Sequence, residues 1–184
     1  MAPPFRLEPF QINPAARHLK RTRDWVLKLD PTADEAMRIA ALTHDVERRV
    51  PGGPTLDAQT RDWDDPEYLC LHSERSAAIV DEWLEQQGGT RELRERVCSL
   101  VRAHEIGGSP DADVVQAADS LSFLENNADR VIAWVDEGRC DREKARQKLD
   151  WMRDRISITG AINTAARLHE KAVTALESAH TERK

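Results

Sequence analysis

The sequence predicts an all-α protein, and three observations lead to this fold class. Apolar residues recur at helical spacing from one end of the chain to the other, whereas no stretch alternates apolar and polar residues between turn signals. Eight glycines and one tyrosine among 184 residues are few for a β-rich chain. The length suits one complete hydrophobic core, so we expect a single domain over residues 1–184.

The first four helices are predicted from their start and stop signals. Asn13-Pro14 and Asp30-Pro31 each combine an N-cap with a first-turn proline, and paired glycines after residues 87 and 106 mark two helix ends. The signals give helices over about 14–29, 31–48 and 67–87, and a fourth between Thr90 and Gly107.

Residues 51–66, PGGPTLDAQTRDWDDP, interrupt the helical pattern with three prolines, two glycines and four aspartates. Such a composition is typical of a long irregular connection. It would form either a lid that faces a substrate or a connection on the surface.

The second half of the chain predicts further helices. A fifth runs over about 110–126, a shorter one reaches residue 137, Asp141 caps another that ends before Gly160, and the last covers about 161–180. The last helix carries an apolar stripe that should pack on the domain, formed by Ile162, Ala165, Leu168, Ala172 and Leu176. Residues 128–182 thus form a helical extension after a core of about 14–126.

Charge and targeting signals restrict the partners and the compartment. Twenty-seven basic and 33 acidic residues give a net charge of -6, which disfavours duplex nucleic acid and an anionic membrane as main partners. The chain has no apolar run as long as a membrane span, and its N-terminus lacks a signal-peptide core. Cys70, Cys98 and Cys140 have neither disulfide-framework nor CxxC spacing. We expect a cytoplasmic protein, and its oligomeric state stays open.

Five successive predicted helices each bring an imidazole or a carboxylate onto the inward face. The residues, in helix order, are His18, His44 with the adjacent Asp45, His72, His104 and Asp119. Burial of such groups is unfavourable unless they satisfy one another or bind a cation. A metal is the simplest common solution.

The ligand chemistry narrows the metal. Imidazole nitrogens and carboxylate oxygens without thiolates favour Mn, Fe, Co, Ni or Zn over Ca. Six ligands exceed the needs of one catalytic ion with open positions, so we expect two divalent ions, with Asp45 as the bridge between them.

The alternative for each histidine is an ordinary hydrogen-bonded core residue, but four such coincidences beside two inward aspartates are improbable. His169 and His180 have no ligand-type partner nearby and are expected on the surface. The cysteines are expected to be packing residues. The scattered tryptophans at 25, 63, 83, 134 and 151 are expected in the core.

The arrangement resembles the HD superfamily of metal-dependent phosphohydrolases. The resemblance rests on His18, the His44-Asp45 doublet in ALTHDVERR, His72 in LHSERSAAIV, His104 in VRAHEIGG and Asp119 in QAADSLSFLE, over about residues 14–126. It implies an HD-domain-like helical bundle with additional C-terminal helices. The order H…HD…H…H…D resembles the binuclear branch of the superfamily.

Two departures from that branch concern the substrate. Relatives there carry a lysine three residues after the aspartate of the doublet, where this chain has Arg48, which keeps the charge and adds a bidentate fork for phosphate. The chain lacks a GYP-containing extension, which counts against hydrolysis of cyclic di-GMP.

The resemblance implies a phosphohydrolase that attacks a small phosphate ester, or a nucleotide-type substrate, with a metal-bridging hydroxide. The first ion would take His18, His44, Asp45 and Asp119, and the second would take Asp45, His72 and His104. Asp45 and Arg48 would be catalytic, and Arg48 and Arg75 would hold the substrate phosphate. Glu47 and Glu105 would orient ligands or donate a proton.

Two other functions stay open. The same ligand order resembles that of HD-type mixed-valent di-iron oxygenases, which cleave carbon-carbon or carbon-phosphorus bonds with dioxygen. A module that senses a nucleotide in the metal pocket without turnover is the third hypothesis.

Overall fold

A computed structural model describes residues 14–54 and 63–179, and within these ranges the chain is helical with no strand. The all-α prediction is therefore confirmed. The helices are α1 (Pro14–Leu29), α2 (Glu35–Thr43), the 3-10 helix η1 (Val46–Arg49), α3 (Pro66–Gln86), α4 (Arg91–Ala103), α5 (Pro110–Asn126), α6 (Ala128–Asp136), α7 (Arg142–Asp154) and α8 (Thr159–Ser178).

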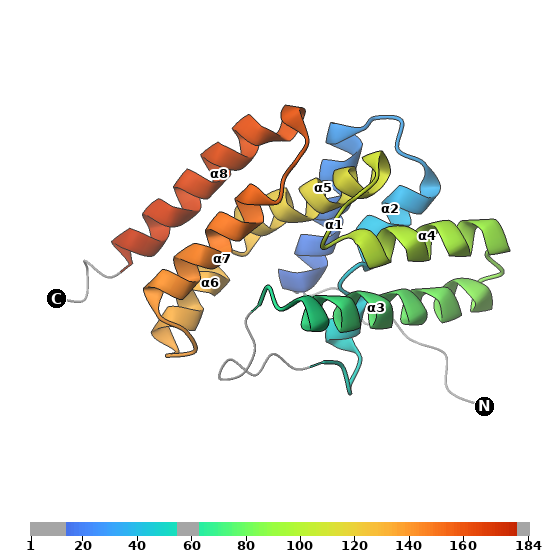
Figure 1. Cartoon of the computed structure of the whole chain (residues 1–184), viewed down its shortest axis with the longest axis horizontal. Helices are drawn as coiled ribbons and strands as arrows, with labels where there is room; N and C mark the ends of the chain where they lie inside the picture. Colours follow the sequence, from blue (N-terminus) through green and yellow to red (C-terminus); the bar gives the residue numbers. More distant parts are fainter. Residues whose placement is uncertain (1–13, 55–62, 180–184) are drawn as a thin grey trace.

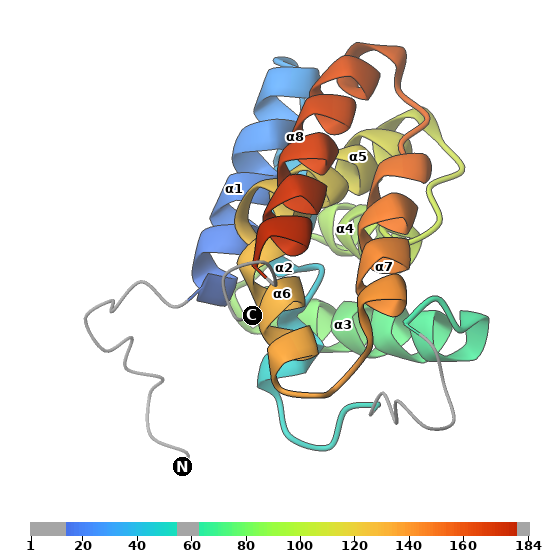
Figure 2. The same cartoon turned by 90° about the vertical axis from the view of Figure 1, so that its left-hand side faces the viewer.

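Helix α5 lies between the two halves of the bundle (Figures 1 and 2). On one side it packs on α1, α2 and α4, and α3 lies against α4. On the other side it contacts α6, α7 and α8. The predicted C-terminal extension thus packs directly on the helix that carries Asp119.

Two clusters of buried apolar side chains stabilise these halves. The first cluster lies among the five helices from α1 through α5 and includes Val26, Met37, Val97, Val101 and Val115. The second joins the end of α5 to α6, α7 and α8 and includes Leu121, Leu124, Leu149, Met152 and Leu176. Trp25 and Leu29 of α1 pack against both clusters, so the two clusters are continuous.

Helix caps explain most boundaries. Asp65, Thr90, Ser109 and Asp141 each accept a hydrogen bond from the backbone N–H three residues later, which satisfies a free donor of the first turn. The predicted cap Asn13 lies outside the described residues, as do residues 55–62 of the long connection and His180.

The second helix is shorter than expected. Asp34 caps it by accepting from the Met37 N–H, whereas Asp30 accepts from the N–H of Thr32 in a turn before the helix. The helix ends at Thr43, and η1 follows from Val46. The expected start at residue 31 is wrong because Asp34 offers the better placed cap.

Several packing predictions are also wrong. His169 is buried, not solvated, because its Nε2 lies 2.6 Å from Asp150 Oδ1 across α7 and α8. Cys70, Trp83 and Ile162 are exposed, although each was expected to pack, while Cys98 is buried as expected. Within the described ranges, no helix is both long and apolar enough to cross a membrane.

Candidate metal centre

The structure brings the six predicted ligand residues together from helices α1, α3 and α5 and from the residues that directly follow α2 and α4. His18 lies on α1, His72 on α3 and Asp119 on α5, and all three are buried. His44 and His104 are the first residues after α2 and α4, and they are buried too. Asp45, at the start of η1, is partly exposed.

The donor atoms form two groups of three. His18, His44 and Asp119 make one, Asp45, His72 and His104 make the other, and within each group the donor atoms lie within 4.8 Å of one another. Asp119 Oδ1 is 3.0 Å from His18 Nε2 and 3.4 Å from His44 Nε2. Asp45 Oδ1 is 3.0 Å from His72 Nε2. Use of Asp45 by both groups stays a prediction.

The Nδ1 atom of each histidine lies within hydrogen-bond distance of an oxygen, which fixes the orientation of the ring. His44 Nδ1 is 3.0 Å from the Ala41 carbonyl and His104 Nδ1 is 2.7 Å from the Val101 carbonyl. The partners of the other two are Ser122 Oγ for His18, at 2.9 Å, and Glu47 Oε1 for His72, at 2.6 Å. A carbonyl or carboxylate can only accept, so Nδ1 carries the hydrogen in at least three rings.

The Nε2 atoms consequently present lone pairs to one another and to carboxylates. Those of His44, His72 and His104 are buried and have no hydrogen-bond partner. A lone pair that faces a carboxylate oxygen at 3.0 Å is repulsive unless a proton or a cation lies between them. Each group therefore fits a metal ion and could hold one.

Arginine side chains control the charge of the two ligand carboxylates. Burial raises the pKa of Asp119, but the guanidinium of Arg155 lowers it, and the pKa lies well below its usual range. For Asp45, burial raises the pKa and the guanidinium of Arg48 lowers it, and the pKa again lies well below its usual range. Both carboxylates are therefore ionised at neutral pH, as metal ligands must be.

Glu47 and Glu105, expected as orienting groups, both lie beside the ligand histidines. Glu47 is buried and accepts from His72 Nδ1, as an orienting carboxylate does. Glu105 Oε1 lies 3.5 Å from His104 Nε2 and 4.0 Å from His72 Nε2, and its other oxygen accepts from Arg155. Burial raises the pKa of Glu105, but the guanidinium of Arg155 outweighs it and lowers the pKa.

The two arginines predicted to bind substrate have different positions. Arg48 lines the pocket over the ligands, where its Nε donates to Asp45 Oδ1 at 3.0 Å and its Nη1 to the hydroxyl of Tyr68 at 2.7 Å. Arg75 does not line this pocket. Its Nη2 donates to the Pro51 carbonyl at 2.6 Å, and its Nε lies 4.0 Å from Glu47 Oε2.

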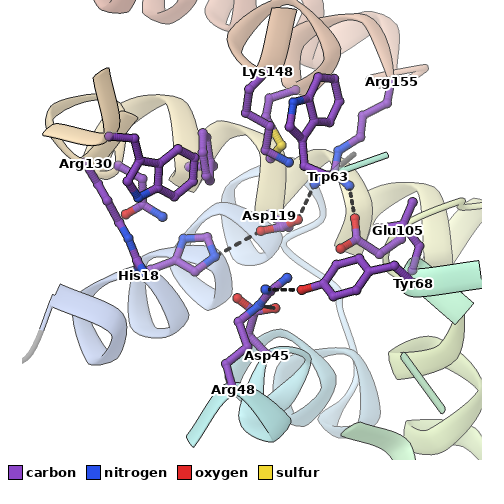
Figure 3. Close-up of a pocket in the computed structure, with 15 residues that line it drawn as sticks. His18, Asp45, Arg48, Trp63, Tyr68, Glu105, Asp119, Arg130, Lys148 and Arg155 are labelled. Carbon is purple, nitrogen blue, oxygen red and sulfur yellow. Dashed lines mark hydrogen bonds and ion pairs between the residues drawn. The ribbon is translucent and has the colours of Figure 1, made fainter. Parts of the chain in front are cut away.

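A pocket of about 130 Å³ opens over the ligands, and part of its lining comes from residues that the sequence reasoning missed (Figure 3). These are Tyr68 on α3, Arg130 on α6, Lys148 on α7 and Arg155 directly after α7. Lys148 and Arg155 are seven residues apart, so they lie on the same helical face, with the buried Met152 between them. Charged residues on an otherwise apolar helix face are the signal that identified Asp119, and it could have identified these two.

Comparisons with known proteins place the chain in a family. Residues 9–176 match the family model described as "Domain of unknown function (DUF4202)", and the chain belongs to that family. No curated protein and no solved structure matches the chain significantly.

Proposed function

For this member of the DUF4202 family, we propose a metal-dependent phosphohydrolase of the HD type, with a binuclear centre. Its substrate would be a small phosphate ester or a nucleotide-type molecule. One observation carries the proposal: two adjacent groups of imidazole and carboxylate donors, in which Asp45 alone is partly exposed, lie beneath a pocket lined by cationic side chains. Two groups of this kind can bind one ion each, and nitrogen and oxygen donors without sulfur suit Mn, Fe, Co, Ni or Zn.

Divalent ions bound there supply Lewis acidity, which activates water at neutral pH and stabilises charge on phosphoryl oxygens. The chain's own side chains would orient the metal ligands and the group that binds the phosphate. Glu47 fixes the ring of His72, and Arg155 holds Asp119 by its second oxygen. Arg48 is itself held by Asp45 and Tyr68, so its remaining N–H groups are oriented to bind a substrate phosphate.

The metal content of the purified full-length protein is the first test. We expect about two transition-metal ions per chain, and we expect His18→Ala and His72→Ala each to lower that number by about one. His169→Ala is the matched control, because His169 is an equally buried histidine that contacts Asp150 outside both donor groups. Metal content near zero, or equal losses in the control, would contradict the binuclear centre.

The reaction is tested with phosphomonoesters, nucleotides, dinucleoside polyphosphates and cyclic nucleotides in the presence of Mn, Fe or Co. We expect phosphate release by the wild-type protein and its loss in Asp45→Asn. A mixed-valent iron EPR signal with substrate-dependent oxygen uptake would instead indicate an oxygenase. Nucleotide binding without turnover under every metal would indicate a sensing module.

A further inference from the structure

Lys148 is a cation enclosed by three aromatic rings. Its Nζ lies 4.1 Å from the centre of the Trp151 ring, 5.0 Å from that of Trp63 and 5.3 Å from that of Phe123. Such contacts are favourable for an ammonium group, but aromatic faces accept no full hydrogen bond from its three N–H donors. The rings therefore hold the amine in position, and its N–H donors stay available to solvent or to a ligand.

No carboxylate of the described residues lies within ion-pair distance of Lys148 Nζ. The charged groups that face it more distantly are Glu105 and Asp119, which favour the charged amine, and Arg155 and Arg48, which disfavour it. Burial has the largest effect, and it lowers the pKa of Lys148 to about 7. An incoming anion would restore the missing partner and favour the protonated amine.

Lys148 lines the same pocket as Asp45, Asp119 and Arg48. In Figure 3 the lysine lies on one side of Asp119, and Arg48 lies together with Asp45 on the other side. Arg155 is also nearby, but its guanidinium is already engaged by Glu105, Asp119 and Ser120. Lys148 and Arg130 are thus the cations on the C-terminal side of the pocket that have hydrogen bonds to offer, and Lys148 is the one whose charged group contacts three aromatic rings.

We propose that Lys148 is a substrate-binding residue whose ammonium group contacts an oxygen of a tetrahedral dianion, the phosphoryl group of the substrate, opposite Arg48. The inference rests on the proposed function for the identity of the substrate. The C-terminal helices carry no residue of either donor group, and through Lys148 they would take a direct part in binding the substrate. The aromatic cage positions the lysine, and the charge of the lysine binds the anion.

The test measures binding of sulfate and of inorganic phosphate to the full-length protein, by calorimetry and by tryptophan fluorescence. Trp63 and Trp151 contact the lysine, so anion binding should change their emission. We expect millimolar or tighter binding by the wild-type protein, a loss of about 10-fold or more in Lys148→Met, and retention of most of the affinity in Lys148→Arg.

Lys28→Met is the matched control, because Lys28 Nζ lies 4.4 Å from the ring of Trp25 on exposed α1 surface outside the pocket. Its affinity for sulfate should equal that of the wild-type protein. Absence of sulfate binding by the wild-type protein, or undiminished binding by Lys148→Met, would overturn the proposal.

The proposed function can fail separately. If no phosphate ester is hydrolysed but sulfate binding depends on Lys148, the anion site stands and the hydrolase does not. If the wild-type protein hydrolyses an ester and Lys148→Met leaves its KM unchanged, only the role of Lys148 is lost.

Discussion

Arg155 holds Asp119 by the carboxylate oxygen that faces away from the histidines. Its Nη2 donates to Asp119 Oδ2, while Asp119 Oδ1 lies 3.0 Å from His18 Nε2. Its Nη1 donates to Glu105, so one buried guanidinium joins two buried carboxylates. The residue that orients a ligand of the N-terminal core is therefore supplied by the C-terminal helices.

Replacing Arg155 should affect stability and metal binding together. Arg155→Met leaves Asp119 and Glu105 as buried charges without their cation, which costs about 3–5 kcal/mol of unfolding free energy. Urea unfolding of the metal-free protein measures this loss, and metal titration should show weaker binding. Arg21→Met removes an equally direct pair, with Glu125, but at a partly exposed position, and should cost about 1 kcal/mol or less. Similar losses in both variants would contradict the special role of Arg155.

Glu47 should act on the metal through His72. Glu47→Gln weakens the acceptor for His72 Nδ1, which lies 2.6 Å away, and the resulting loss of ring orientation and basicity should lower metal affinity about 10–100-fold. Competition with a chelator measures the affinity. Glu74→Gln, at an exposed position on the same helix as His72, is the control and should bind metal normally. Unchanged affinity in Glu47→Gln would rule out this role.

Replacement of Arg48 and replacement of Arg75, the two arginines predicted to bind substrate, should change kcat/KM by different amounts. Arg48→Met removes a charge-assisted contact to the phosphate and should lower kcat/KM about 10–100-fold, with partial recovery in Arg48→Lys. Arg75 does not line the pocket over the ligands, so Arg75→Met should change kcat/KM much less and act through Glu47. Initial rates of phosphate release compare the variants. A larger loss in Arg75→Met would reverse the assignment.

The lysine in the aromatic cage should destabilise the protein near neutral pH. Its pKa is about 7 in the native protein and about 10.4 in an unfolded chain, so between these values the unfolded state binds more protons. The unfolding free energy contributed by Lys148 therefore rises with pH from about 7 to about 10. Lys148→Met should be more stable than the wild-type protein at pH 7, by about 1–3 kcal/mol, and the difference should shrink towards pH 10.

Urea unfolding of the metal-free protein at several pH values measures this difference. Lys28→Met, which alters an exposed lysine over a single ring, should show no comparable trend. A wild-type protein that is more stable than Lys148→Met at pH 7 would contradict the expected cost of burying the amine.

Much of the helical framework could be predicted locally. Thr90 and Asp141 are strong start signals, and the helices that follow them begin at the next residue, as the sequence indicates. The start of α2 could not be predicted in this way, because Asp30 and Asp34 both resemble caps. Only the folded turn shows which N–H donates a hydrogen bond to each carboxylate.

His169 shows why the histidines could not all be sorted by sequence. Its neighbours in the chain offer no ligand, yet Asp150 of α7 lies 2.6 Å from its Nε2 after α7 and α8 pack together. Contacts between residues far apart in sequence decide whether such a side chain is buried. Helical periodicity alone does not contain that information.

The sequence by itself determined the all-α class and the candidate donors, because helical spacing and caps are local and a buried polar residue on an apolar face is conspicuous. Only the tertiary structure decided that Asp45 lies with His72 and His104, that Arg155 and Lys148 reach the pocket from the C-terminal helices, and that Arg75 does not. The reason is physical. Distances between side chains on different helices depend on how the helices pack, which is set by the whole core rather than by any one segment.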